Sequence, residues 1–182
     1  MISPTLFLPA ALALITAAAC SDGDQRSSHL PDTIAVRSWT VTPGGIGPIR
    51  VGMTVAEARA AIGSELPSPA DSTCAYITPA VGPRGVLLMV AGGRVVRVDV
   101  RDTTVATSAG ARVGSTETEI ERLYPGRVSV TPHKYTMGHY LTVAPAAPAD
   151  SLFRIVFETD SGRATTYRAG MLPMVEWVEG CS

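Results

Sequence analysis

The residues with the greatest potential for chemistry lie at positions 131–143, in the stretch TPHKYTMGHYLTV. His133 and His139 are the side chains there that could bind a metal ion or transfer a proton. On one extended strand, residues six positions apart lie on the same face, about 20 Å from each other. A turn at Met137-Gly138 would bring the two rings closer, but no Asp, Glu or Cys nearby would complete a set of metal ligands. We therefore predict neither a metal site nor a cofactor.

A binding surface is our prediction for the same stretch. The side chains of His133, Tyr135, His139 and Tyr140 combine a large contact area with polar tips, which is typical of protein recognition. An ordinary β-hairpin with half-buried tyrosines would explain these residue types equally well. The alternative function is a secreted or lipid-anchored hydrolase or metal-binding protein with a site around His133 and His139.

Known catalytic and phosphate-binding motifs are absent from the sequence. There is no Gly-x-Ser-x-Gly motif, and Ser115 is not near a His along the chain. The glycines at 44–48 (GGIGP) precede an apolar strand instead of a helix, so they do not predict a phosphate site. Glu158 and Asp160 lie beside a predicted turn, where we expect solvated carboxylates. We predict no catalytic residue, and therefore a protein that is not an enzyme.

The N-terminus has the pattern of an export signal. Its apolar run is shorter than the roughly 20 residues of a transmembrane helix, and it ends in small residues. The end of the run, Ala17-Ala18-Ala19-Cys20, resembles the lipobox of bacterial lipoproteins, in which a lipid is attached to the Cys. We predict a signal peptide at 1–19 and a lipidated Cys20 with a tether at 20–43. The protein would then be anchored in the cell envelope, facing the periplasm or the exterior. Plain secretion and an uncleaved anchor are the alternatives.

The composition limits the class of partner. The chain carries 15 Lys and Arg residues against 16 Asp and Glu residues, which gives a formal net charge of −1. A nucleic-acid-binding protein normally has a basic excess or a basic patch. We therefore expect the partner to be a protein or another envelope component, besides the membrane that the lipid enters, and no nucleic acid.

Two cysteines remain after Cys20, namely Cys74 and Cys181. In an oxidising compartment such a pair usually forms a disulfide. A thiol nucleophile or a metal ligand is the alternative, but neither cysteine has a CxxC motif or an adjacent His. The disulfide would fix the end of the chain to its first half, and on the chain-entropy model it could stabilise by up to roughly 4–5 kcal/mol.

One sequence motif occurs twice, as RVGMTVAE at 50–57 and as RVGSTETE at 112–119, and the two copies are 62 positions apart. In each copy the Thr and the Glu three residues later have the spacing of a capping box, the reciprocal hydrogen bonding that begins a helix. The Gly before the Thr suits a turn with an unusual φ. We predict short helices at 55–62 and 117–124.

The strands repeat as well. Tyr76-Ile77-Thr78 corresponds to Tyr140-Leu141-Thr142, and the predicted hairpin at 85–100 corresponds to the one at 152–169. Alternation places Val96, Val98 and Val100 on the inward face, with Thr165, Tyr167 and Ala169 at the matching positions. We predict an α+β fold: a tandem repeat, with copies at 44–106 and 107–182, of a short helix followed by antiparallel strands, the helices covering one face of the sheet.

The repeated motif resembles that of a known family. Gly52-Met53-Thr54-x-x-Glu57 and the related Gly114-Ser115-Thr116-x-x-Glu119 resemble the opening of the SmpA/OmlA (BamE-like) domain of envelope lipoproteins. Two such units in tandem resemble the β-lactamase inhibitory protein fold. The resemblance implies a non-enzymatic, protein-binding envelope module. Those families generally have a second helix after the first, whereas residues 63–85 are too rich in Pro and Gly to form one.

Overall fold

The computed structural model describes residues 39–69 and 73–181, which belong to one unit spanning residues 36–182. The predicted signal peptide, the predicted lipidation site Cys20 and most of the tether lie outside the described residues. In the part that is described, no helix has the length and apolar character needed to cross a membrane.

Short helices and mostly short strands make up this unit. The strands are β1 (Val41–Thr42), β2 (Gly45–Ile46), β3 (Ile49–Arg50), β4 (Cys74–Ile77), β5 (Val86–Ala91), β6 (Arg94–Val100), β7 (Val128–Pro132), β8 (His139–Val143), β9 (Phe153–Asp160) and β10 (Arg163–Met171). The helices are α1 (Val55–Ile62), α2 (Glu117–Leu123) and the 3₁₀ turns η1 (Pro148–Asp150) and η2 (Met174–Glu176).

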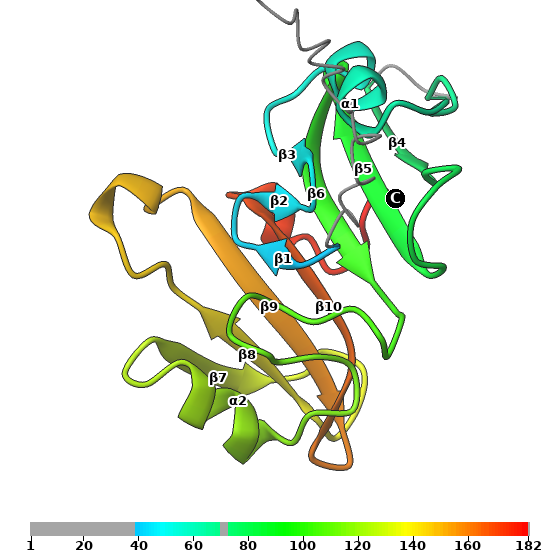
Figure 1. Cartoon of the computed structure of the whole chain (residues 1–182). Helices are drawn as coiled ribbons and strands as arrows, with labels where there is room; N and C mark the ends of the chain where they lie inside the picture. The colour runs from blue at the N-terminus through cyan, green and yellow to red at the C-terminus, as the bar shows by residue number, and fades with distance from the viewer. Residues whose placement is uncertain (1–38, 70–72, 182) are drawn as a thin grey trace, which may run out of the picture. The chain divides into compact units, whose positions relative to one another are not determined.

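The strands form two antiparallel sheets. The smaller one has the order β1-β2-β3, and the larger one has seven strands in the order β4-β5-β6-β10-β9-β8-β7. The first half of the chain supplies β4 to β6 and the second half supplies β7 to β10, so the halves meet where β6 pairs with β10 (Figure 1).

The predicted α+β class, with helices covering one face of the sheet, is wrong: the unit is mostly β, with two sheets and two short α-helices. The physical reason is size. A helix of eight residues is about 12 Å long, whereas seven strands spaced about 4.8 Å apart extend over roughly 29 Å. The small sheet and the long connections therefore contribute to the core together with the helices. Buried core residues from outside the large sheet include Val41, Ile46, Ile49, Ala58, Ile62, Leu66, Val105, Ala111, Ile120 and Tyr124.

The capping boxes predicted for the two helices are confirmed. The Thr54 side chain accepts from the Glu57 N–H at 3.2 Å, and the Glu57 carboxylate accepts from the Thr54 N–H at 2.7 Å. The second copy has the same pair, with the Glu119 N–H donating to Thr116 Oγ1 at 3.2 Å. The hydrogen bonds that each threonine donates to the glutamate carboxylate, from its backbone N–H first and then from its side chain, lower the pKa of both glutamates. Gly63 ends α1 in the left-handed conformation, at φ 63°.

Each copy of the repeated motif is also hydrogen-bonded to the hairpin that follows it. The sequence did not predict these hydrogen bonds. In the first copy, Gly52 has φ +96° and its N–H donates to the Val95 carbonyl at 2.7 Å. The Val95 N–H donates to the Met53 carbonyl at 2.8 Å. Arg94, directly after the hairpin turn, donates through Nη1 to the Gly52 carbonyl at 2.8 Å. These hydrogen bonds join the motif and the hairpin into one structural unit.

The second copy repeats these contacts one by one. Gly114 has φ +93°, and its N–H donates to the Ala164 carbonyl at 2.7 Å. The Ala164 N–H donates to the Ser115 carbonyl at 2.9 Å. Arg163 donates through Nη1 to the Gly114 carbonyl at 3.0 Å. The local structures are therefore equivalent, while the copy boundaries at 44–106 and 107–182 stay predictions.

The predicted alternation fails at one point in each hairpin. In the first copy, Val95 pairs with Val90 and belongs to the core, and the register shifts before Arg97, so that Val96 is an extra residue. In the second copy the shift leaves Thr165 exposed, and Ala164 takes the buried position. One extra residue reverses which side chains face inward, because side chains alternate with a period of two.

Candidate functional site

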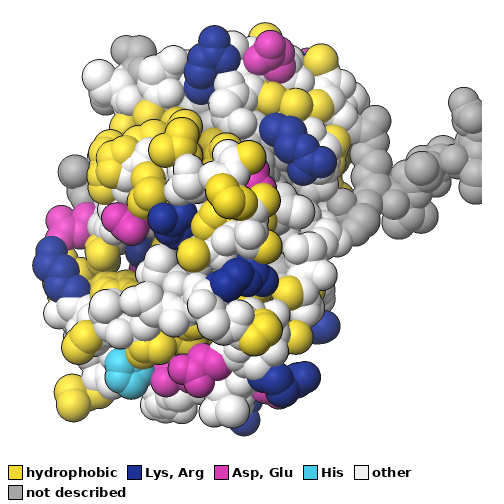
Figure 2. All heavy atoms as spheres, turned by 90° about the vertical axis from the view of Figure 1, so that its left-hand side faces the viewer, with side chains coloured by type: hydrophobic (Ala, Val, Ile, Leu, Met, Phe, Trp, Pro, Cys, Tyr) yellow, Lys and Arg dark blue, Asp and Glu magenta, His cyan; other side chains and the backbone are white. Residues whose placement is uncertain are grey.

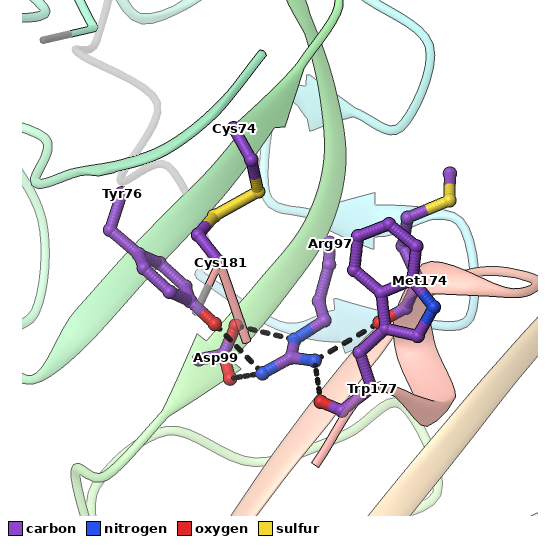
Figure 3. Close-up of a disulfide and its surroundings, with 7 residues drawn as sticks. All are labelled: Cys74, Tyr76, Arg97, Asp99, Met174, Trp177 and Cys181. Carbon is purple, nitrogen blue, oxygen red and sulfur yellow. Dashed lines mark hydrogen bonds and ion pairs between the residues drawn. A yellow bond between two sulfur atoms is a disulfide. The ribbon is translucent and has the colours of Figure 1, made fainter. Parts of the chain in front are cut away.

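The last residues of the chain return to the face of the large sheet that lies opposite the core. We call residues 172–181 the strap. The strap contains η2 and ends at Cys181, which forms a disulfide with Cys74 on β4, at a Cα–Cα distance of 5.4 Å (Figure 3). The predicted disulfide is thus confirmed, and it joins residues 107 positions apart.

The guanidinium of Arg97 on β6 lies beside Met174 and Trp177 of the strap (Figure 3). It donates to both oxygens of Asp99, at 2.8 and 2.6 Å, and to the Tyr76 hydroxyl at 2.9 Å. It also donates to the carbonyls of Met174 and Trp177, at 3.0 and 2.6 Å. All five N–H donors of this guanidinium are therefore used, and Arg97 is only 3% exposed. Burial, followed by the charge of Asp99, raises the pKa of Tyr76.

Arg168 on β10 is a second buried contact to the strap. It is 4% exposed and donates through Nε to the Val175 carbonyl at 2.6 Å. Its Nη1 donates to Glu158, and the other Glu158 oxygen lies 3.5 Å from Nε2 of His133. The guanidinium carbon lies 5.9 Å from the centre of the Tyr140 ring. Arg168 thus links the strap to residues of the predicted binding surface.

This cluster was missed from the sequence because a covering layer, the helices, was predicted on one face of the sheet alone. The strap covers the opposite face, which is why Arg97 and Arg168 are buried. Glu158, expected to be solvated, is paired with Arg168, and its side chain is only 18% exposed. Charged residues on strands in the middle of a sheet, combined with a cysteine pair that brings the C-terminus back, were the available signal.

The structure brings three of the four predicted surface residues together. The His133 ring stacks on the Tyr140 ring at a centroid distance of 4.4 Å, and it meets the Tyr135 ring edge-on at 6.3 Å. Nδ1 of His133 accepts the N–H groups of Tyr135 and Thr136, each at 3.1 Å. Residues 133–138 connect β7 to β8, and we call them the aromatic turn. The contacts of His133 hold this turn in its conformation.

His139 lies on the other side of the sheet. It shares the core-facing side of β8 with Leu141, whereas Tyr140 faces the strap side. Its Nδ1 lies 2.9 Å from Oε1 of Glu117, and Thr159 donates to the same oxygen at 2.5 Å. The hydrogen bond from Thr159 lowers the pKa of Glu117, and that with His139 adds to the effect.

A joint site of the two histidines is therefore not formed, because the turn leaves their side chains on opposite faces of the hairpin. Among residues 39–69 and 73–181, no group of three or more His, Cys, Asp or Glu side chains is arranged to hold a metal ion. The alternative function around His133 and His139 gains no geometric support.

The tip of the aromatic turn is exposed but anchored. Tyr135 is 60% exposed and Met137 is 96% exposed. Lys134 forms an ion pair with Glu179 of the strap at 2.7 Å, and the Tyr135 hydroxyl donates to the same Glu179 oxygen. These hydrogen bonds raise the pKa of Lys134 and lower that of Glu179. The turn and the strap are thereby tied into one surface.

An open cavity of about 470 Å³ lies between these two segments, lined by Cys74, Lys134 and residues 177–181. Trp177, at the edge of this cavity, is 42% exposed. The face of the molecule in Figure 2 shows Lys and Arg side chains dispersed among acidic ones, with a histidine beside acidic side chains. Among the described residues, no large patch of one charge is therefore visible on that face.

Searches against protein-family models, curated proteins and solved structures find no match to this chain. The resemblance to the SmpA/OmlA (BamE-like) domain and to the β-lactamase inhibitory protein fold stays a prediction based on the repeated motif.

Proposed function

We propose that this protein is a non-catalytic binding module of the cell envelope, anchored by a lipid on Cys20. Its binding surface is the aromatic turn together with the exposed part of the strap. The partner is a protein that presents an apolar or aromatic side chain to the open cavity between the two segments.

The observation that carries this proposal is that the aromatic turn exposes large side chains while hydrogen bonds hold its backbone and its neighbouring side chains in place. Tyr135 and Met137 expose large side chains, while Lys134 and Tyr135 are bonded to Glu179 and the Tyr135 N–H to His133. A preorganised surface loses little conformational entropy on binding. Tyr is enriched among the residues that dominate protein interfaces, and Met adapts to irregular apolar surfaces. This combination favours protein recognition over simple solvation.

Site-specific photocrosslinking in the cells from which the chain comes tests the proposal. Benzoylphenylalanine replaces Met137 in one variant and Leu152 in another. Leu152 is a matched control because it is 58% exposed and precedes β9, whereas the aromatic turn lies near the other end of that strand. We expect a discrete protein adduct from position 137 and none from position 152.

A second variant distinguishes specific binding from chance proximity. Tyr135→Ala, combined with the crosslinker at position 137, should lower the adduct yield by roughly tenfold or more, as for a central interface residue. If the yield stayed the same, or if positions 137 and 152 gave the same adducts, the aromatic turn would not be the binding surface.

The lipid anchor requires its own experiment. Cys20→Ser should release the protein from the membrane fraction, because lipidation of this residue supplies the proposed attachment. Unchanged membrane association of the variant would contradict the anchor without affecting the binding surface.

A further inference from the structure

A second cavity, of about 260 Å³, lies between the strap and the strap-facing side of the large sheet. It adjoins the open cavity at the aromatic turn and shares Val178, Glu179 and Gly180 with it, but its other lining residues lie on or beside the large sheet and take no part in the proposed protein-binding surface. The lining residues that matter for its chemistry are Tyr76, Leu87, Arg101, Glu158, Arg168 and Val178.

Arg168 has unused hydrogen-bonding capacity in the wall of this cavity. Its Nε donates to the Val175 carbonyl, and its Nη1 donates to Glu158. Its Nη2 makes no hydrogen bond to any of residues 39–69 or 73–181. Arg97, which lies on the neighbouring strand β6 and bonds the same strap, uses all five of its donors. The Arg168 guanidinium, in a residue that is only 4% exposed, therefore has donors left for an acceptor in the cavity.

Arg101 and Tyr76 supply further donors to the same cavity. Arg101 is exposed, and its side chain makes no hydrogen bond or ion pair with the part of the chain that the structure describes. The Tyr76 hydroxyl accepts a hydrogen bond from Arg97, so its own proton is available to an acceptor in the cavity (Figure 3). Donors from three strands or strand ends therefore surround one space.

The charges favour an anion with a single negative charge. Asp99 is matched by Arg97 and Glu158 by Arg168, while Glu179 at the rim is matched by Lys134. Arg101 adds one positive charge that these pairs do not compensate. The carboxylates of Asp99, Glu158 and Glu179 remain in the lining and would repel a doubly charged ligand such as phosphate.

The cavity also has an apolar part. Leu87 on β5 and Val178 of the strap are half-buried and line it together with the charged groups. The volume of about 260 Å³ is below the range of roughly 300–1,000 Å³ that is typical of sites for drug-sized ligands. We propose that this cavity binds a small monocarboxylate with a short apolar chain. The carboxylate is held by Arg101, Arg168 and the Tyr76 hydroxyl, and the chain lies against Leu87 and Val178.

Isothermal titration calorimetry of the full chain tests this proposal, with hexanoate, acetate and inorganic phosphate as probes at equal ionic strength. Hexanoate should bind saturably at one site and more tightly than acetate, because its chain adds apolar contact. Phosphate should bind more weakly than hexanoate. In the ¹⁵N spectrum, hexanoate should shift the Nε–H signal of Arg168.

Two variants locate the site, and one serves as control. Arg101→Gln should weaken hexanoate binding by roughly tenfold or more, since a charge-assisted contact is lost. Val178→Ala should weaken hexanoate by roughly threefold and leave acetate nearly unchanged. Arg122→Gln on α2, which changes another exposed arginine, should bind as the original chain does.

Each alternative result has a definite meaning. No saturable binding of either carboxylate, or equal binding by Arg101→Gln and the original chain, overturns the proposal. Tighter binding of phosphate than of hexanoate overturns the ligand class. Because Arg101 holds no other residue in place, Arg101→Gln should melt at the same temperature as the original chain, so a loss of binding cannot be attributed to unfolding.

Discussion

The two copies of the repeat share their scaffold and differ in what covers it. Residues on the hairpins correspond at a separation of 69 positions, as Arg94 does to Arg163. At the buried positions, the first copy pairs Leu88 with Val98 and the second pairs Phe157 with Tyr167. The same backbone therefore accepts an aliphatic core in one half and an aromatic core in the other, with rings at 5.2 Å.

The central pair of the sheet shows how the copies meet. Asp99 lies opposite Arg168 where β6 pairs with β10, and at a separation of 69 positions these residues are each other's counterparts. Their charges are opposite, and each has an ion-pair partner in its own half, Arg97 for Asp99 and Glu158 for Arg168. The two copies therefore place opposite charges at corresponding positions of the face that the strap covers.

The second copy also has an additional strand and turn. In the second copy, α2 is followed by β7, the aromatic turn and β8, whereas in the first copy no strand lies between α1 and β4 in the described residues. The strap adds a further difference, because it is bonded to Cys74 in the first copy and to Lys134 in the second. The aromatic turn and the strap therefore lie in structure that the copies do not share, whereas the cavity beneath the strap is also lined by strands of both copies.

Core truncation should test whether the copies unfold together. Phe157→Ala should lower the free energy of unfolding by about 3–5 kcal/mol, and Leu88→Ala at the matching position by about 2–5 kcal/mol, from lost burial and the cavity created. Because β6 pairs with β10 within one sheet, both variants should show one transition in urea, with coincident fluorescence and circular dichroism. Two separate transitions would mean that the copies are independent folding units.

The next effect concerns the two buried arginines. Arg97→Met should destabilise by about 3 kcal/mol, because it leaves Asp99, whose side chain is only 13% exposed, without its partner. Arg168→Met should cost less, since fewer hydrogen bonds are lost and Glu158 retains His133 nearby. Urea denaturation of both variants provides the comparison.

A double variant checks the explanation for Arg97. Adding Asp99→Leu to Arg97→Met should recover part of the lost stability, because the uncompensated charge is removed. Equal losses in the two single variants, or no recovery in the double variant, would show that the strap is not held as we describe.

The capping boxes should give smaller and equal effects. Thr54→Ala and Thr116→Ala should each lower the free energy of unfolding by about 1 kcal/mol, the usual value for loss of an N-cap. We expect equal losses of stability because the hydrogen bond from the Glu N–H to the Thr Oγ1 measures 3.2 Å in both copies. Thr54→Ser and Thr116→Ser are controls that keep the cap. An effect confined to one copy would contradict the local equivalence of the two helices.

The smallest effect is a pH dependence of the same caps. The pKa values of Glu57 and Glu119 are lowered in the folded state by hydrogen bonds from Thr54 and Thr116. Their contribution to stability is therefore complete above the ordinary value of 4.5 and is lost as the pH falls through the lowered values.

Glu57→Ala/Glu119→Ala should accordingly melt below the original chain at pH 7, and the two melting curves should converge on acidification. Thermal melts between pH 7 and pH 2.5 measure this difference. A melting-point difference that grew as the pH fell would have the wrong sign for a lowered carboxyl pKa.

The repeated motif explains why part of the fold was predictable. Capping boxes and hairpin turns depend on residues close together in sequence, so α1, the two long hairpins and the end of α1 at Gly63 were predicted almost to the residue. The extra residues Val96 and Thr165 were not predictable from alternation, since a bulge depends on how the neighbouring strand pairs.

The binding surface shows the same limit. Tyr135 and Tyr140 were recognised from their residue types, but whether His139 joined them depended on where the chain turned. Arg168 was missed because a charged side chain on a strand is ordinarily solvated, and only the returning C-terminus buries it.

The sequence by itself determined the helix starts, the hairpins and the pairing of Cys74 with Cys181, because local hydrogen bonding and the count of cysteines left few alternatives. Only the tertiary structure decided that β6 and β10 join the copies, that the strap covers Arg97 and Arg168, and that a cavity remains beneath it. These features depend on contacts between residues far apart along the chain, and no local pattern specifies which distant segment will cover a given face.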